Sequence, residues 1–244
     1  MGSIKKKNEK EFGFNKPFFL THMVLPILPV IAISYILMIA GGDFWLTTKI
    51  YKYQGYEWRL TDHWIAANIL HKGGKNVSLT ALLILIAIVC SSFFKVGSSF
   101  RTWRLPLIYL SSSVLLCVFS IGILKTVTNM DCPWSLAEFG GDRPFVGLFE
   151  HRPSSIGRGN CFPAGHASAG YAWIGLYFFF LMSKPLFRWR GLAIGITLGL
   201  IFGLTQQLRG AHFISHDLWA LAICWYISAL TYIAFSLKTQ YRVG

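Results

Sequence analysis

Long runs of hydrophobic residues alternate with shorter polar segments along this chain. An α-helix needs about 20 mainly apolar residues to cross the roughly 30 Å hydrocarbon core of a bilayer. Hydropathy places such segments near residues 18–40, 77–94, 106–124, 167–182, 192–208 and 218–236. We therefore predict an all-α, six-transmembrane helix bundle that forms one domain over residues 1–244.

Lysine and arginine predict how these spans are oriented. Basic residues gather in the N-terminal segment, in the short connections at 95–104 and 184–190, and near the C-terminus. Most of the acidic residues lie in the long connections at 42–76 and 125–166. Because cytoplasmic loops are enriched in Lys and Arg, we expect both termini in the cytoplasm and the long loops outside. A bacterial inner membrane, with the long loops in the periplasm, fits best.

The formal charge of +13 does not indicate a nucleic-acid partner. The basic residues are spread over helix ends and loops that a bilayer would separate. The positive-inside bias and anionic lipid headgroups account for them instead.

The five cysteines fall into two groups. Cys90, Cys117 and Cys224 lie inside apolar spans, where a cysteine is a small core residue. Cys132 and Cys161 lie in the long outer loop, in an oxidising compartment if the loop is periplasmic. A disulfide between them would close a loop of roughly 30 residues and stabilise the fold by about 3 to 4 kcal/mol. Two unpaired thiols are the alternative.

Ionisable residues at the ends of apolar spans are costly in a membrane and therefore point to function. Lys125 closes the third predicted span and His166 opens the fourth. Arg209, His212, His216 and Asp217 lie between the fifth and the sixth. By the predicted topology, all of these positions face the same outer side.

The stretch from Cys161 to His166 leads directly into an apolar helix. Gly165 lets the backbone approach a ligand, and exposed amides at a helix start favour an anion such as phosphate. His166 could then donate a proton to a leaving oxygen. The alternative is a solvated histidine at the start of a helix.

The stretch from Arg209 to Asp217 holds a guanidinium, two imidazoles and a carboxylate in nine residues. A neutral imidazole can attack phosphorus when an acceptor holds its other ring nitrogen and fixes the tautomer. Phosphoryl transfer also needs positive charge on the phosphate oxygens, which Lys125 and one or more arginines could supply.

These residues resemble the motifs of the PAP2 phosphatases. The first family motif is Lys, six residues, then Arg-Pro; here Lys125 is followed by Cys132-Pro133. The second is Pro-Ser-Gly-His; here Pro163 to His166 reads Pro-Ala-Gly-His. The third is Ser-Arg, five residues, His, three residues, Asp, and its histidine matches His212. The resemblance implies that His212 forms a phosphohistidine, that His166 is the general acid, and that no metal or other cofactor is needed.

Several positions depart from the family pattern. Cys132 and Gln206 stand where the first and third motifs have arginine, and Ala164 replaces the serine of the second. We predict that Arg209 substitutes for the arginine missing at Gln206. His216 occupies the position of the motif's aspartate and Asp217 follows it, so either could orient His212. We favour Asp217, because a carboxylate is always an acceptor at neutral pH.

The arginine missing at Cys132 has two candidate replacements, Arg143 and Arg152, each followed by proline. We favour Arg152, which lies nearer the phosphate-binding turn. The alternative is that both arginines merely solvate the loop.

The predicted function is hydrolysis of a phosphate monoester or diphosphate on a membrane lipid. The family implies undecaprenyl diphosphate, phosphatidylglycerol phosphate, phosphatidic acid or lipid A phosphates as substrates. A phosphotransferase acting between lipids would use the same residues. Alternatives of other classes are a membrane metal or haem protein that uses His212 and His216 as ligands, a thiol-redox protein that uses Cys132 and Cys161, and an inactive scaffold.

Overall fold

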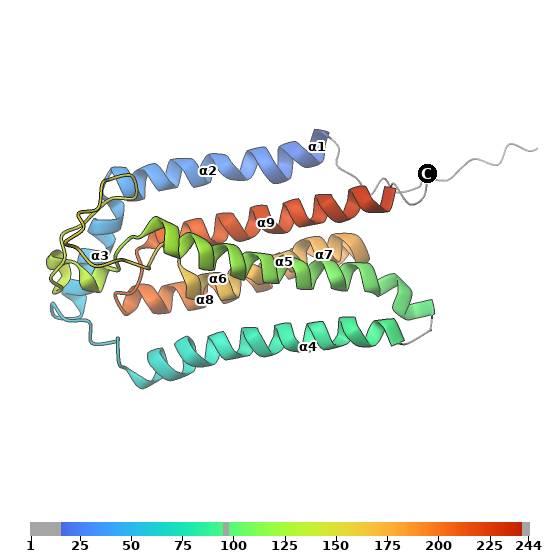
Figure 1. The fold of residues 1–244 in the computed structure, drawn as a ribbon, viewed down its shortest axis with the longest axis horizontal. Helices are drawn as coiled ribbons and strands as arrows, with labels where there is room; N and C mark the ends of the chain where they lie inside the picture. The colour runs from blue at the N-terminus through green and yellow to red at the C-terminus, as the bar shows by residue number, and fades with distance from the viewer. Residues whose placement is uncertain (1–15, 95–97, 241–244) are drawn as a thin grey trace, which may run out of the picture.

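The computed structural model describes residues 16–94 and 98–240, and their regular structure is helical (Figure 1). This confirms the predicted all-α bundle. The α-helices are α1 (Lys16–Phe19), α2 (Leu25–Ser34), α3 (Gly42–Tyr53), α4 (Gly74–Phe94), α5 (Ser98–Thr128), α6 (Gly165–Tyr171), α7 (Gly175–Ser183), α8 (Arg188–Leu208) and α9 (Ile214–Gln240). Stretches of π-helix at Leu20–Val24, Tyr35–Ile39 and Ile65–Gly73 extend the chain before and after α2 and before α4.

Five helical stretches among the described residues are long and apolar enough to cross a membrane. They are Lys16–Ile39, Ile65–Phe94, Arg101–Ser135, Pro185–Leu208 and Ile214–Leu237. The predicted span at 167–182 differs from these. It is helical from Gly165 to Ser183, through α6, a 3-10 turn at Ala172–Ile174 and α7, and most of its residues are buried inside the bundle.

The α6–α7 segment lies inside the bundle and packs against α5, α8 and α9. Its approach to α8 is close enough to require glycine. A side chain at Gly170 would collide with the backbone of Gly199, and one at Gly195 would collide with the backbone of Ile174. Small residues let helix backbones meet in membrane bundles, where packing replaces the hydrophobic driving force. The apolar residues of this segment are therefore covered by protein.

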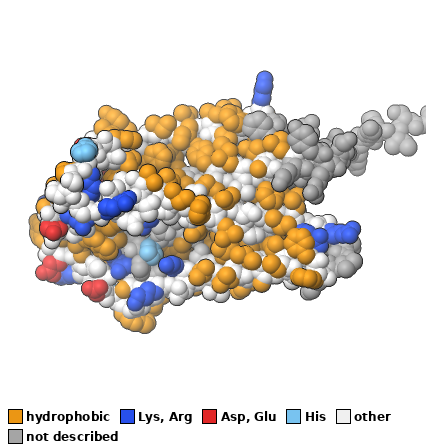
Figure 2. Space-filling model, viewed as in Figure 1, with side chains coloured by type: hydrophobic (Ala, Val, Ile, Leu, Met, Phe, Trp, Pro, Cys, Tyr) orange, Lys and Arg blue, Asp and Glu red, His pale blue; other side chains and the backbone are white. Residues whose placement is uncertain are grey.

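The loops divide between the two ends of the bundle as the hydropathy pattern predicts. At one end lie α3, the loop 129–164 and the turn from α8 to α9, on the left in Figure 1. At the other end lie the start of α1, the C-terminal ends of α4 and α9 and the start of α5. Apolar side chains cover much of the flank between them, and the acidic side chains seen on this face gather at the left end (Figure 2). We call the left end the loop end.

A small second core at the loop end fixes α3 over the start of α9. Its buried members are Leu136, Phe139 and Phe213, against which Phe44, Tyr51 and Trp58 pack. Asp43, at the start of α3, accepts a hydrogen bond from the backbone N–H of Ser215 at 3.0 Å. A carboxylate at that place satisfies a free amide at the start of α9 and complements the helix dipole. The chain just before α9 is thereby held in place.

Candidate functional site

A cavity of about 360 Å³ opens at the loop end, where segments distant in sequence meet. Its wall is formed by Lys125, Asp131, Cys132, Trp134, Ser135, Arg143, Arg158, Gly159, Asn160, Cys161, His166, Gln206, Ala211 and His212. Lys125, His166 and His212, which the sequence predicts to act together, all line it. They come from the last turn of α5, the start of α6 and the segment between α8 and α9.

His212 lies in this wall because the chain turns sharply after α8. α8 ends at Leu208. Gly210 then has a φ of +73°, a backbone conformation that residues other than glycine rarely adopt. His212 follows in the short segment before α9 and is 5% exposed. Its Nδ1 lies 3.4 Å from Nδ1 of His216, which is fully buried. One nitrogen of this pair must donate and the other accept, so the contact makes the tautomer of each ring depend on that of the other.

Asp217 lies away from His212. Its carboxylate accepts a hydrogen bond from the side-chain amide of Gln207 and fills the space beside Gly203 on α8. Neighbouring residues on a helix point about 100° apart, so His216 and Asp217 cannot face the same partner. The preference for Asp217 as the partner of His212 is therefore wrong, and His216 takes that place.

Lys125 and His166 meet at the turn that begins α6. Gly165 leaves room for the lysine, because a side chain at that position would lie 3.2 Å from the Lys125 Nζ. The turn is joined to the histidine pair by a hydrogen bond of 3.1 Å from the backbone N–H of Ala164 to the carbonyl of His216. The backbone thus holds the second and third motif segments together.

Arg209 does not line the cavity, contrary to the sequence prediction. Its Nε donates to the carbonyl of Thr61 at 2.9 Å, and its Nη1 donates to Oε1 of Gln206 at 3.2 Å. The guanidinium therefore ties the loop before α4 to the end of α8. Gln206, at the position where the motif has arginine, lines the cavity instead.

The two Arg-Pro arginines share one buried carboxylate. Arg143 Nη1 lies 2.8 Å from Oδ1 of Asp131, and Arg152 Nη2 lies 2.7 Å from Oδ2. Arg152 also donates to the carbonyls of Asn129 and Gly157, and its side chain is 10% exposed. Arg143 lines the cavity, whereas Arg152, the candidate favoured from the sequence, does not. Arg158 lines the cavity too, although no motif position indicates it.

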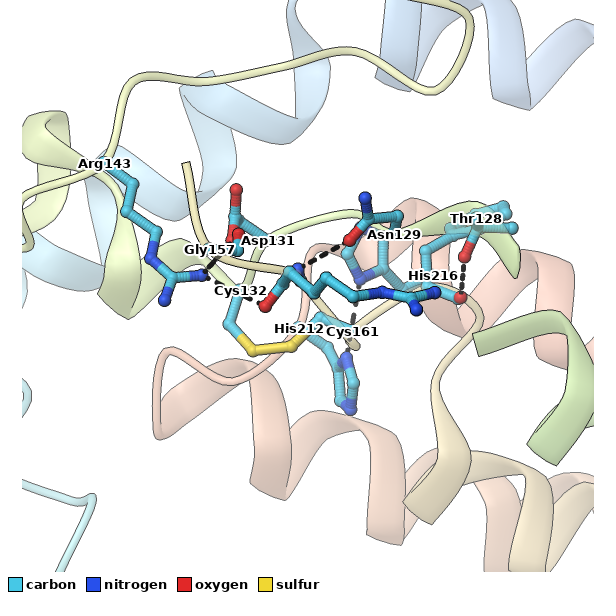
Figure 3. Close-up of a disulfide and its surroundings, with 12 residues drawn as sticks. Thr128, Asn129, Asp131, Cys132, Arg143, Gly157, Cys161, His212 and His216 are labelled. Carbon is cyan, nitrogen blue, oxygen red and sulfur yellow. Dashed lines mark hydrogen bonds and ion pairs between the residues drawn. A yellow bond between two sulfur atoms is a disulfide. The ribbon is translucent and has the colours of Figure 1, made fainter. Parts of the chain in front are cut away.

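Cys132 and Cys161 form a disulfide in the cavity wall, with their Cα atoms 5.3 Å apart. Figure 3 shows it beside Asp131 and His212, with Arg143 reaching toward Asp131 and Gly157. A second tie runs parallel to it, a hydrogen bond of 3.0 Å from the backbone N–H of Cys161 to the carbonyl of Met130. These links hold the two ends of the loop 129–164 together above His212.

The surroundings of His212 lower its pKa well below the ordinary value of 6.5. Burial is the largest cause, and the electrostatic effects of His216, Lys125 and His166 act in the same direction. A hydrogen bond to the Cys161 carbonyl works against them. His212 is therefore neutral at pH 7, the state in which an imidazole is a nucleophile.

An apolar groove of about 320 Å³ adjoins the polar cavity. It lies between α4, α5 and α6 and is lined by Lys75, Ser78, Leu79, Leu82, Val114, Val118, Ile121, Gly122, Lys125, Gly165, His166, Ser168 and Ala169. Lys125 and His166 belong to both walls. Sequence reasoning missed this groove, because which faces of α4 and α5 stay uncovered depends on their packing.

The family model of the PAP2 superfamily matches residues 106–240, more than half of the chain. The chain belongs to the PAP2 superfamily. The match runs from α5 to α9 and includes Lys125, His166 and His212. No curated protein and no solved structure matches the chain significantly. Members of the PAP2 superfamily are phosphatases and phosphotransferases, and this chain is a multi-pass membrane protein with phosphatase-type activity.

Among the described residues, no group of three or more histidine, cysteine, aspartate and glutamate side chains is arranged to hold a metal ion. His212 and His216 face each other through Nδ1, which gives both rings a role without a metal.

Proposed function

We propose that this PAP2 protein hydrolyses a phosphate monoester or diphosphate on a membrane lipid through a phosphohistidine on His212. The observation that carries the proposal is the meeting of an apolar groove with a cationic cavity at Lys125 and His166. A lipid phosphate has the same two parts, a hydrocarbon chain and an anionic headgroup. The reacting phosphate would lie in the cavity and the chain in the groove.

The first chemical step forms the phosphoenzyme. His212 donates from Nδ1 to His216, and the lone pair of its Nε2 attacks phosphorus. The bond from phosphorus to the leaving oxygen breaks, and His166, in its protonated form, gives its proton to that oxygen. The lipid product leaves with a free hydroxyl, or with one phosphate fewer. His216 is a positioning residue in this scheme, and Lys125 stabilises the charge on the phosphoryl oxygens.

The second step regenerates the enzyme. Water attacks the phosphorus of the phosphohistidine, and neutral His166 takes a proton from the water. The P–N bond breaks, its electron pair returns to His212, and inorganic phosphate leaves. If a lipid hydroxyl replaces water, the same residues perform phosphotransfer. Phosphate release in the absence of an acceptor lipid distinguishes hydrolysis from transfer.

The positive-inside pattern supports an active site on the outer, periplasmic face of a bacterial inner membrane. The loop end holds the acid-rich connections, and the opposite end carries Lys184, Arg188 and Arg190. Undecaprenyl diphosphate, phosphatidylglycerol phosphate, phosphatidic acid and lipid A phosphates all place a phosphate at such a surface. A panel of these four lipids, assayed for released phosphate, identifies the substrate.

Filling the groove tests whether the substrate is a lipid. Gly122 lines the groove, and a Cβ added there meets no atom within 4 Å. Gly122→Phe should therefore fold normally and occupy space that the lipid chain needs. We expect kcat/KM for a long-chain lipid phosphate to fall at least about tenfold, because overpacking a filled site costs about 1 to 3 kcal/mol. A short, water-soluble phosphate ester should react at the wild-type rate.

Leu116→Phe is the matched control for this experiment. Leu116 lies on the same helix, is 46% exposed and does not line the groove. Its variant should leave both substrates unaffected. Equal loss on the long and short substrates in Gly122→Phe, or no loss on either, would contradict the proposed place of the chain.

The low pKa of His212 predicts the acid side of the pH profile. The nucleophile must be neutral, and a folded-state pKa well below 6.5 keeps it neutral as the pH falls from 8 to 6.5. The acid limb of kcat/KM reports the free enzyme and should lie below pH 6.5. A thiophosphate substrate, whose own pKa is lower, separates substrate titration from enzyme titration. An enzyme limb at or above pH 6.5 would show that His212 titrates normally.

A further inference from the structure

We propose that Arg143 and Arg158, both carried by the loop 129–164, bind the reacting phosphate together with Lys125. The proposal rests on the proposed function and deepens it. We call Lys125, Arg143 and Arg158 the phosphate clamp. Its two arginines come from a loop, whereas the motif positions Cys132 and Gln206 carry no cation in this chain. Arg158 belongs to none of the motifs.

The charges that line the cavity favour an anion. Its cationic side chains are Lys125, Arg143 and Arg158, and its one carboxylate is Asp131. That carboxylate is already paired with two guanidiniums, those of Arg143 and Arg152. His212 is neutral at pH 7 and adds no charge. The cavity thus has an excess of positive charge beside the proposed nucleophile.

Arg143 is held through one guanidinium nitrogen, which leaves its other N–H donors available to a ligand in the cavity. Its hydrogen bonds to Asp131, to the carbonyl of Gly157 and to the carbonyl of Arg158 all use Nη1. Within the described residues, its Nε and Nη2 donors form no hydrogen bond. Its side chain is 34% exposed and lines the cavity, so these donors can reach a ligand there. A guanidinium fixed on one side loses little freedom when it binds phosphate on the other.

Arg158 is placed next to Lys125 by a different contact. Its Nη2 donates to the carbonyl of Thr126, the residue after Lys125 in the last turn of α5. The backbone around it is fixed as well, because the N–H of Gly159 donates to Oδ1 of Asn129 at 2.8 Å. Arg158 therefore brings a second cation to the end of α5, at the same cavity wall as Lys125.

The disulfide and Asp131 form the frame that carries both arginines. Cys132 follows Asp131, and Cys161 lies three residues after Arg158. The disulfide thus joins the segment that anchors Arg143 to the segment that bears Arg158. At Cys132 a motif arginine has been replaced by a covalent link, and the link holds a loop that supplies arginines from elsewhere. Arginine suits this task because its planar fork binds phosphate through two hydrogen bonds.

Phosphate binding and turnover, measured together, test the clamp. We would titrate inorganic phosphate into the full chain in detergent at fixed ionic strength, and measure kcat/KM on a lipid phosphate. Arg158→Gln is the deciding variant, because Arg158 is exposed and its replacement leaves the Asp131 pairs intact. Arg59→Gln is the matched control, since Arg59 is an exposed arginine that pairs with Glu57 and does not line the cavity.

Arg158→Gln should raise the Kd for phosphate about tenfold and lower kcat/KM at least as much, the effect of losing one charged hydrogen bond. Arg143→Lys keeps the charge and loses the fork, so it should weaken binding by a smaller factor. Arg59→Gln should behave as wild type.

The two proposals fail in different ways. If the wild-type protein binds phosphate but releases none from any lipid, the proposed function is contradicted. The clamp is then tested only by the Kd for phosphate of the variants relative to wild type. If all variants hydrolyse lipid phosphate and bind phosphate as wild type does, the clamp is overturned and the function stands.

Discussion

Replacing His212 with alanine is expected to abolish phosphate release from lipid phosphates. The variant removes the attacking nitrogen, and no other group can form the phosphoenzyme in its place. Loss of a covalent nucleophile should lower kcat by at least about 10³-fold, leaving only the contribution of binding and charge. The fold should survive, since the neighbouring backbone is fixed by Gly210 and by the Asp43 bond to Ser215. Released phosphate, measured on purified protein in detergent, gives the result.

Trapping the intermediate makes the same prediction sharper. Wild-type protein quenched in alkali after mixing with radiolabelled substrate should carry an acid-labile label on His212, and His212→Ala should carry none. His151→Ala is the matched control, because His151 is exposed in the loop 129–164 and does not line the cavity. Turnover near the wild-type rate in His212→Ala, or label on another residue, would contradict the mechanism.

The helices of this protein were predictable because a bilayer requires long apolar segments. The predicted spans agree with the helices α4, α5, α8 and α9 except at their ends. The largest difference is before α4, where the helix begins at Ile65 although hydropathy starts it near residue 77. Asn68, Lys72 and Lys75 interrupt the apolar pattern there. Hydropathy detects the part of a helix that suits hydrocarbon and misses a polar extension of it.

The buried position of the α6–α7 segment could not be read from the sequence. The stretch 167–182 is apolar because protein surrounds it, and apolarity alone does not distinguish a protein-covered helix from a lipid-facing one. The glycines of α8 allow the α6–α7 segment to lie close to α8. Pairs of glycine and backbone atoms on different helices become visible only in the assembled bundle.

The site was predictable where ionisable residues end apolar helices. Lys125, His166 and His212 each stand at such an end on one side of the membrane, and the bundle brings them to one cavity. The arginines were not predictable. Arg143 and Arg152 are each followed by proline, and the sequence does not show that only Arg143 lines the cavity while Arg152 is held by Asp131 and two backbone carbonyls.

The partner of His212 depended on helical phase. His216 and Asp217 are adjacent in sequence, and the starting point of α9 decides which of them faces His212. The turn at Gly210 sets that starting point, and a turn of this kind has no periodicity from which the phase can be calculated. Chemical preference for a carboxylate was therefore a weaker guide than position in the motif, which gives His216.

Replacing His166 with alanine should slow the reaction in a way that depends on the leaving group. A lipid alkoxide is a poor leaving group and needs a proton as the P–O bond breaks, so we expect kcat to fall about 10²- to 10⁴-fold. A p-nitrophenolate leaves without a proton, and formation of the phosphoenzyme from p-nitrophenyl phosphate should be affected far less. Lys125→Met is the matched control, because Lys125 lines the same two cavities. Its charge acts on the phosphoryl oxygens, so its loss should slow both substrates by a similar factor.

The comparison separates an acid from a phosphate ligand. If His166 gives its proton to the leaving oxygen, the ratio of the two rates changes in His166→Ala and stays constant in Lys125→Met. If His166 only binds phosphate, both variants slow both substrates alike, and the general acid must be another group. The burst of p-nitrophenolate in the first turnover measures formation of the phosphoenzyme directly, because the second step also uses His166 to activate water. A full burst followed by slow turnover in His166→Ala is the result expected of a residue that serves as acid in the first step and base in the second.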